Sequence, residues 1–142
     1  MKRRDSLLRL KRFRVDEFKR RLATLDEMKA DLERKLAELD DTVARERQRA
    51  SDSEIGRLAF PSFLQSIDAR RANIRATMKD LDAERSTVQD GLAAAFQDLK
   101  SFELAEQERE RRLAEAAART AQSRLDDIAI VRHLRKHAGR QV

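Results

Sequence analysis

Apolar residues recur along the first third of the chain in alternating steps of three and four. Thirteen positions follow this rhythm from 8 to 50, and ten of them are apolar: Leu8, Val15, Phe18, Leu22, Leu25, Leu32, Leu36, Leu39, Val43 and Ala50. A 3.5-residue period sustained for about six heptads is typical of supercoiled helices, because only supercoiling keeps such a stripe facing one partner. The pattern predicts a long helix over about 3–50 with a coiled-coil seam.

A second stretch with the same period follows a break. Residues 51–62 hold the one proline, Pro61, and one of the three glycines, together with Ser and Asp, which compete for helical backbone hydrogen bonds. Proline fits the first turn of a helix, so we expect a loop over about 51–61 and a second helix over about 62–138. Beyond Phe102 its apolar stripe weakens, since polar residues take up the stripe there: Glu106, Arg109, Thr120, Ser123 and Asp127.

Two long helices joined by a short loop can bury both stripes by folding back on each other. We therefore predict an all-α fold, a long two-helix antiparallel coiled-coil hairpin spanning residues 1–142 as one domain, with the second helix overhanging. The numbers of opposed residues should add to about 110, because positions near 50 and 60 face each other at the loop. The overhang is then about 25 residues, or about 35–40 Å. A parallel or antiparallel dimer of open chains would satisfy the same pattern.

Composition argues against an enzyme. Charged residues make up 41% of the chain and aromatic residues 4%, and there is no Cys or Trp. Such a chain builds long helices rather than a pocket that could shift the pKa of a catalytic group. His133 and His137 have the i, i+4 spacing of metal ligands, but two ligands in a basic segment do not make a site. We expect no catalytic residue, metal or cofactor, and no apolar run reaches the roughly 20 residues of a membrane span.

Positive charge gathers at the start of the chain. Residues 1–20 contain nine Lys or Arg and three acids, which equals the +6 formal net charge of the whole chain. Apolar residues lie off the seam in the same stretch, at Leu7, Leu10 and Phe13, with Arg4 and Arg14 nearby. Exposed apolar residues rimmed by arginine are typical of interaction hot spots. Extra packing against the second helix would explain the same residues.

Two other places carry apolar residues that could bind a partner. Near the end of the chain, Ile130 and Leu134 lie within an apolar and basic segment. At the loop, the candidates are Phe60, Phe63 and Leu64. These three residues could close the end of the coiled coil, offer a docking site, or do both.

The opening Met-Lys-Arg-Arg-Asp-Ser-Leu-Leu-Arg-Leu-Lys-Arg-Phe, the turn Ala59-Phe60-Pro61-Ser62-Phe63 and the continuation Asp68-Ala69-Arg70-Arg71-Ala72-Asn73-Ile74 resemble the flagellar export protein FliJ family, particularly its alphaproteobacterial members. The resemblance implies an antiparallel coiled coil similar to the central stalk of rotary ATPases. It implies a cytoplasmic protein, peripheral to the inner membrane at the flagellar base. Its partners would be the flagellar type III export ATPase, whose ring it enters and activates, the membrane export gate, and export chaperones.

Carried onto this chain, the resemblance makes the basic, apolar end the candidate ATPase contact: Arg4, Leu7, Leu10, Phe13, Arg14, Ile130 and Leu134. Phe60, Phe63 and Leu64 become the candidate export-gate contacts. The family's better-known members carry Tyr on the gate-binding side and this chain has no Tyr, so individual gate contacts are not transferred. Two other functions fit the residues: binding of nucleic acid or an anionic membrane through residues 1–20, or an architectural coiled-coil dimer. No specific nucleic-acid partner is expected, because aromatic stacking platforms are missing.

Overall fold

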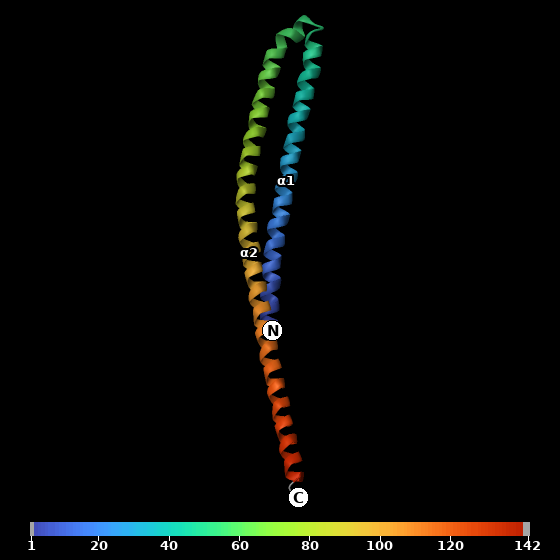
Figure 1. The fold of residues 1–142 in the computed structure, drawn as a ribbon. Helices are drawn as coiled ribbons and strands as arrows, with labels where there is room; N and C mark the ends of the chain where they lie inside the picture. The colour runs from blue at the N-terminus through green and yellow to red at the C-terminus, as the bar shows by residue number, and fades with distance from the viewer. Residues whose placement is uncertain (1, 141–142) are drawn as a thin grey trace. The chain divides into compact units, whose positions relative to one another are not determined.

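The computed structural model describes residues 2–140, which form two helices (Figure 1). Helix α1 (Lys2–Ala50) has 49 residues, and helix α2 (Glu54–Arg140) has 87. The two helices pack against each other as a hairpin, and the second is the longer, as the periodicity predicts. The described residues fall into two compact units, one ending at Gln97 and one beginning at Asp98. The first unit contains α1 and the part of α2 up to Gln97, and the second contains the remainder of α2.

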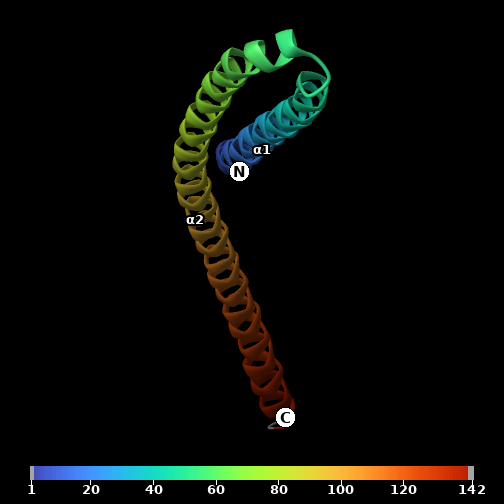
Figure 2. The same cartoon turned by 90° about the horizontal axis from the view of Figure 1, so that it is seen from above.

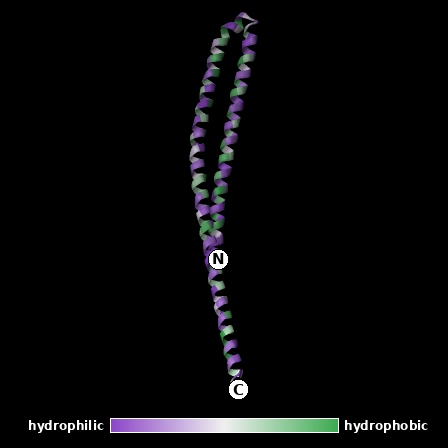
Figure 3. Ribbon diagram, viewed as in Figure 1, coloured by the Kyte–Doolittle hydropathy of each residue, from purple (hydrophilic) through white to green (hydrophobic). Residues whose placement is uncertain are grey.

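The seam predicted from the sequence forms the core of the first unit. Hydrophobic and hydrophilic residues alternate in short stretches along both helices (Figure 3), which is the surface pattern of a seam that winds around a partner. The buried residues described in this unit are Val15, Leu25, Val43 and Ala50 on the first stripe, and Ile67, Leu81 and Val88 in α2. The three in α2 are spaced by whole heptads, as the predicted second stripe requires. Leu25, Leu81 and Val88 form one cluster, against which Phe18, Leu22 and Leu32 pack.

Gly91 makes room for the ring of Phe18. A Cβ atom built on Gly91 would lie 2.6 Å from Phe18 Cε1 and 2.8 Å from Phe18 Cζ, closer than carbon atoms approach in ordinary packing. Glycine inside a helix costs about 1 kcal/mol relative to alanine, so its presence in α2 needs a reason. The reason here is the close approach of an aromatic side chain from the opposite helix.

Charged residues on the seam are paired across the hairpin. Lys29, Arg71 and Arg85 interrupt the apolar stripes, and each forms an ion pair with an aspartate of the other helix. Lys29 Nζ lies 2.9 Å from Asp82, Arg71 Nη2 lies 2.6 Å from Asp40, and Arg85 Nε lies 2.7 Å from Asp26. An additional pair joins Arg21 and Glu84.

These pairs show the register of the hairpin directly. The two residue numbers of the pairs that involve Lys29, Arg71 and Arg85 add to 111 in each case, as 29 and 82 do. The predicted value of about 110 therefore describes the first unit well. Ion pairs on an exposed surface contribute about 0–1 kcal/mol each, so they select orientation and register more than they stabilise the hairpin.

Helix α2 begins eight residues before the position expected from the sequence. The loop is only residues 51–53, because Ser53 caps the helix: its side-chain oxygen accepts a hydrogen bond of 2.9 Å from the Gly56 backbone N–H. Ala50 approaches closely, since a Cβ on Gly56 would lie 3.1 Å from the Ala50 Cα. Pro61 consequently lies inside α2 rather than in its first turn. The first turns of α2 are angled away from the rest of the helix (Figure 2), a bend that proline explains.

The second unit is a single helical stretch with little burial. Leu99 is buried, but every residue from 109 to 140 is exposed. Ion pairs within the helix support it: Arg111 binds Glu108 at 2.6 Å and Glu115 at 2.5 Å, and Arg112 Nε lies 3.2 Å from Glu108. The hydrogen bond from Arg111 lowers the pKa of the Glu108 carboxyl below its ordinary value. No helix within residues 2–140 has an apolar stretch long enough to cross a membrane.

Candidate docking surfaces

The apolar residues near the start of α1 are about half exposed. Leu7, Leu10 and Phe13 keep 43%, 54% and 50% of their surface accessible, whereas Val15, on the seam, is buried. These residues are spaced three apart along α1, so each side chain is rotated around the helix relative to the one before it. All three lie off the seam. We name Leu7, Leu10 and Phe13 the N-terminal surface. Packing within the first unit leaves half of this surface open.

The arginines predicted to rim the N-terminal surface differ in burial. Arg14 is exposed, whereas Arg4, which shares the face of the seam, is partly buried and takes part in an interaction within the chain. Arg14 follows Leu10 by four residues and Leu7 by seven, so it lies on their side of α1. The basic rim beside the exposed apolar side chains therefore includes Arg14.

The apolar residues near the end of α2 are equally open. Ile130 and Leu134 are 57% and 61% exposed, and Ile128 and Val131 are 50% and 47% exposed. A shallow hollow of about 320 Å³ lies on another side of the helix from Ile130 and Leu134, lined by Asp127, Ile128, Val131, Arg132 and Arg135. We name Ile130 and Leu134 the C-terminal surface. It belongs to the second unit and the N-terminal surface belongs to the first, so the two are separate features of the fold.

The two histidines in this segment contact each other edge to face. The ring centroids of His133 and His137 are 4.5 Å apart in an edge-on arrangement. Within residues 2–140, no group of three or more His, Cys, Asp or Glu side chains is placed to hold a metal ion. The i, i+4 spacing thus places two imidazoles side by side without a third protein ligand.

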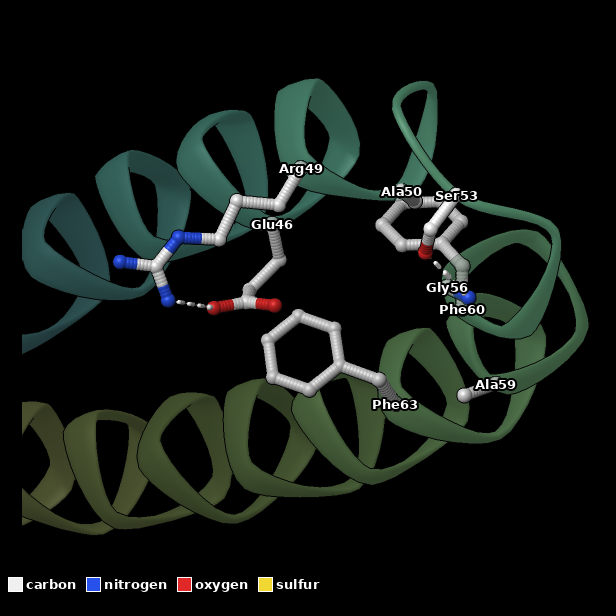
Figure 4. A pocket seen from close by; sticks show the side chains of 8 residues that line it. All are labelled: Glu46, Arg49, Ala50, Ser53, Gly56, Ala59, Phe60 and Phe63. Atoms are coloured by element: carbon white, nitrogen blue, oxygen red, sulfur yellow. Dashed lines mark hydrogen bonds and ion pairs between the residues drawn. The ribbon is translucent and has the colours of Figure 1, made fainter.

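The aromatic residues near the loop close the end of the hairpin. Phe60 and Phe63 have ring centroids 6.3 Å apart, and the Arg47 guanidinium lies 5.7 Å from the centre of the Phe60 ring. Both rings line a pocket of about 320 Å³ between the end of α1 and the beginning of α2 (Figure 4). Phe60, Phe63 and Leu64 are each partly buried. Their contacts fit the packing role, and they leave only part of each side chain available to a partner.

The most exposed large apolar residues in the described chain are ones that the sequence analysis did not name. Ile55 and Leu58 are 81% and 79% exposed. They lie three residues apart in the first turns of α2, so they share one side of the helix. We name Ile55 and Leu58 the tip surface. The expected loop over 51–61 gave these residues no helix face, whereas reading Ser53 as an N-cap would have revealed the pair.

The polar and charged side chains of the described residues all reach the surface. None of their polar or charged side chains is buried, and no buried side-chain nitrogen or oxygen lacks a hydrogen-bond partner. At Arg71, the hydrogen bond to Asp40 raises the pKa of the guanidinium above its ordinary value. That shift strengthens a charge that is already fixed at neutral pH. The exposed apolar surfaces are the features of the described residues that fit binding to another molecule.

Comparison with known proteins gives one match. A family model described as "Flagellar FliJ protein" matches residues 1–138, nearly the whole chain. Comparison with curated proteins and with solved structures finds no match.

Proposed function

Because the chain belongs to the FliJ family, whose members are non-enzymatic components of the flagellar export apparatus, we propose that it acts as a stalk for the export ATPase. In this proposal the protein binds the ATPase ring, promotes its assembly and activity, and couples it to the export gate and to export chaperones. Its place is in the cytoplasm, peripheral to the inner membrane at the flagellar base. The likeness to alphaproteobacterial members stays a prediction that rests on the residues quoted for it.

The single observation that carries the proposal is the exposure of apolar side chains at positions where a hairpin does not need them. Leu7, Leu10 and Phe13 each keep about half of their surface open, and so do Ile130 and Leu134. Removing apolar surface from water stabilises a contact by roughly 25 cal/mol per Å², so such residues favour a protein partner. We assign the N-terminal surface with Arg4 and Arg14, and the C-terminal surface, to the ATPase contact.

A basic residue beside the N-terminal surface supports an acidic partner. Arg14 is exposed and lies on the same side of α1 as Leu7 and Leu10. Complementary charge raises association rates and suppresses wrong partners more than it adds affinity. The contact with the ATPase should therefore form more slowly as salt concentration rises.

The end of the hairpin is our candidate for the export gate. Phe60, Phe63 and Leu64 remain the proposed contacts, and the greater exposure of Ile55 and Leu58 adds the tip surface to them. Phe60 lies beside Phe63 and the Arg47 guanidinium in the turns of α2 that follow Ile55 and Leu58, whose own side chains are exposed. A partner that binds here would contact Ile55 and Leu58 first.

The test is ATP hydrolysis by the export ATPase of the same organism, with and without this protein, alongside light scattering for ring formation. Leu10→Asp and Leu134→Asp should each reduce stimulation at least tenfold, which corresponds to about 1.4 kcal/mol. Met28→Asp is the matched control, because Met28 is also apolar and 46% exposed but lies outside the proposed surfaces. Circular dichroism confirms that all three variants stay helical.

Equal stimulation by the Leu10, Leu134 and Met28 variants would refute the assignment of the surfaces. Absence of stimulation by the wild-type protein, with an ATPase that is active alone, would refute the stalk function itself. For the tip surface, Ile55→Asp and Leu58→Asp should weaken binding to the cytoplasmic domain of the gate protein and leave ATPase stimulation unchanged. If these variants instead reduced ATPase stimulation and left gate binding unchanged, the two partner assignments would have to be exchanged.

A further inference from the structure

The exposed part of α2 has the pattern of a helix that pairs with a copy of itself. All residues from 109 to 140 are exposed, and a solitary helix of this length has little intrinsic stability in water. One narrow side of this helix combines charge and apolar residues. With 3.6 residues per turn, the residues between 110 and 132 that lie within an arc of about 80° on this side are seven: Glu110, Ala114, Ala117, Ala121, Leu125, Ile128 and Arg132.

This side is self-complementary in size. If two copies lie antiparallel with Ala121 facing Ala121, then Leu125 of one copy faces Ala117 of the other, and Ile128 faces Ala114. Large residues opposite small ones let two helices interdigitate without voids or overlap. The first unit uses the same kind of fit where the Phe18 ring approaches Gly91. Leu125 and Ile128 are 60% and 50% exposed, so the surface that would be buried is now open to solvent.

The same arrangement is complementary in charge. Glu110 of each copy faces Arg132 of the other, one turn beyond the apolar layers, and this occurs twice because the arrangement is two-fold symmetric. Within residues 2–140 neither Glu110 nor Arg132 forms an ion pair, unlike Glu108 and Arg111, which pair within the helix. A parallel arrangement would instead place Glu110 against Glu110 and Arg132 against Arg132, and like charges at facing positions disfavour it.

We propose that two copies of the chain associate through the side of α2 defined by Glu110, Ala114, Ala117, Ala121, Leu125, Ile128 and Arg132, antiparallel and centred on Ala121. The contact is about 33 Å long at 1.5 Å per residue. It joins two intact hairpins, and so differs from a dimer of open chains. The C-terminal surface points elsewhere, because Leu134 lies about 140° around the helix from the centre of this side. The proposal therefore does not depend on the ATPase contact.

Sedimentation velocity of the full chain tests the association. The apparent mass should rise from 16.5 kDa toward twice that value as concentration increases. Glu110→Lys and Arg132→Glu should each abolish this rise, whereas the double variant should restore it, because the charges are then exchanged. Asp127→Lys is the matched charge control, since Asp127 lies outside the proposed side, and it should dimerise as the wild type does. A mass of 16.5 kDa at every concentration overturns the proposal, and so does a double variant that stays monomeric.

Apolar variants locate the contact on the helix. Ile128→Asp should abolish the dimer and Leu134→Asp should preserve it, although both residues are at least half exposed. The opposite result would move the contact to another side of α2 and overturn the assignment. If the chain stays monomeric but sediments with anionic phospholipid vesicles in a manner that requires Arg132, the surface belongs to a membrane instead and the proposal fails.

Cross-linking determines the orientation, and the lack of cysteine in the chain makes it clean. Ala114→Cys and Ile128→Cys chains, carrying different tags, are mixed and treated with a short bismaleimide. An antiparallel dimer gives the mixed product that joins residue 114 to residue 128. A parallel dimer gives only products that join equal positions, and that result would overturn the proposal.

Discussion

Replacement of Gly91 by alanine adds one methyl group where α2 meets the ring of Phe18. The new Cβ would lie 2.6 Å from Phe18 Cε1, whereas carbon atoms pack at about 3.5–4.0 Å. The ring must therefore move by about 1 Å, within a cluster in which Phe18 packs against Leu25, Leu81 and Val88. Gly91→Ala is thus a direct test of the fit between the helices.

Two opposing terms determine the size of the effect. Alanine is favoured over glycine inside a helix by about 1 kcal/mol. Forcing an extra methyl group into a packed site costs about 1–3 kcal/mol. The net change in the wild-type background should be a loss of about 0–2 kcal/mol in the free energy of unfolding, as the difference between these two ranges. In a Phe18→Ala background the ring is gone, so Gly91→Ala should instead stabilise by about 1 kcal/mol.

Urea titration followed by far-ultraviolet circular dichroism measures the four proteins of this double-mutant cycle. The expected coupling energy is about 1–3 kcal/mol. Gly139→Ala is the control, because nothing lies within 4 Å of a Cβ at that position and the change should not destabilise the protein. If Gly91→Ala stabilises the protein equally with and without Phe18, the two residues are not in contact and our description of the packing is wrong.

Three further predictions concern the first turns of α2 and its far half. Pro61→Ala should raise the thermal midpoint, because alanine restores a backbone N–H that can donate to the Arg57 carbonyl, and proline inside a helix costs about 3 kcal/mol; a lower midpoint would show that the bend is needed. Ser53→Ala should lower the free energy of unfolding by about 1 kcal/mol by removing the cap on the Gly56 N–H, and Ser62→Ala, at an exposed position, should not. The Arg111 hydrogen bond lowers the pKa of Glu108, so the bond stabilises the helix fully above pH 4.5, the ordinary pKa of the carboxyl, and the stabilisation is lost as pH falls through the lowered pKa. Glu108→Gln should therefore flatten the loss of helicity in acid, measured by circular dichroism. An unchanged pH profile would argue against this pair.

The seam of the hairpin was predictable because its signal is distributed over many residues. Val15, Leu25 and Val43 in α1, and Ile67 and Val88 in α2, are buried where the heptads place them. A single polar residue on the stripe does not disturb the pattern, since Arg71 reaches Asp40 across the hairpin. Register follows from the same repetition, because a shift by one residue would turn every apolar side chain away from its partner.

The loop was less predictable because its signals are local and compete. Pro61 and Ser62 fit a helix start as well as Ser53 and Glu54 do. Proline is the stronger local signal, so the prediction placed the helix start there. The hydrogen bond from Gly56 to Ser53, and the close approach of Ala50, favour the earlier start. Ile55 and Leu58 were overlooked for this reason, since their shared face exists only if the helix has already begun.

The role of Gly91 could not be read from the sequence at all. Glycine in a long heptad stretch looks like a weak point, and only the position of Phe18 on the opposite helix explains it. The partners of the N-terminal, C-terminal and tip surfaces likewise cannot be read from the sequence. Exposure identifies Leu10 or Ile55 as open, but the choice of partner depends on chemistry that belongs to the other molecule.

The ion pairs at a constant register have a consequence for how this protein can change in length. The spacing of charged residues in one helix matches the spacing in the other. Asp26, Lys29 and Asp40 in α1 each pair with a residue of α2 at the same register. One residue inserted between Lys29 and Asp40 would rotate the rest of α1 by about 100° and turn its apolar stripe away from α2. Seven residues inserted in α1 alone would keep the apolar stripe facing α2. The charged residues of α1 after the insertion would then no longer lie opposite their ion-pair partners in α2. Length can therefore be gained or lost without disruption only as matched heptads at opposed places in both helices, so that an insertion in one helix requires a second insertion far away in the sequence.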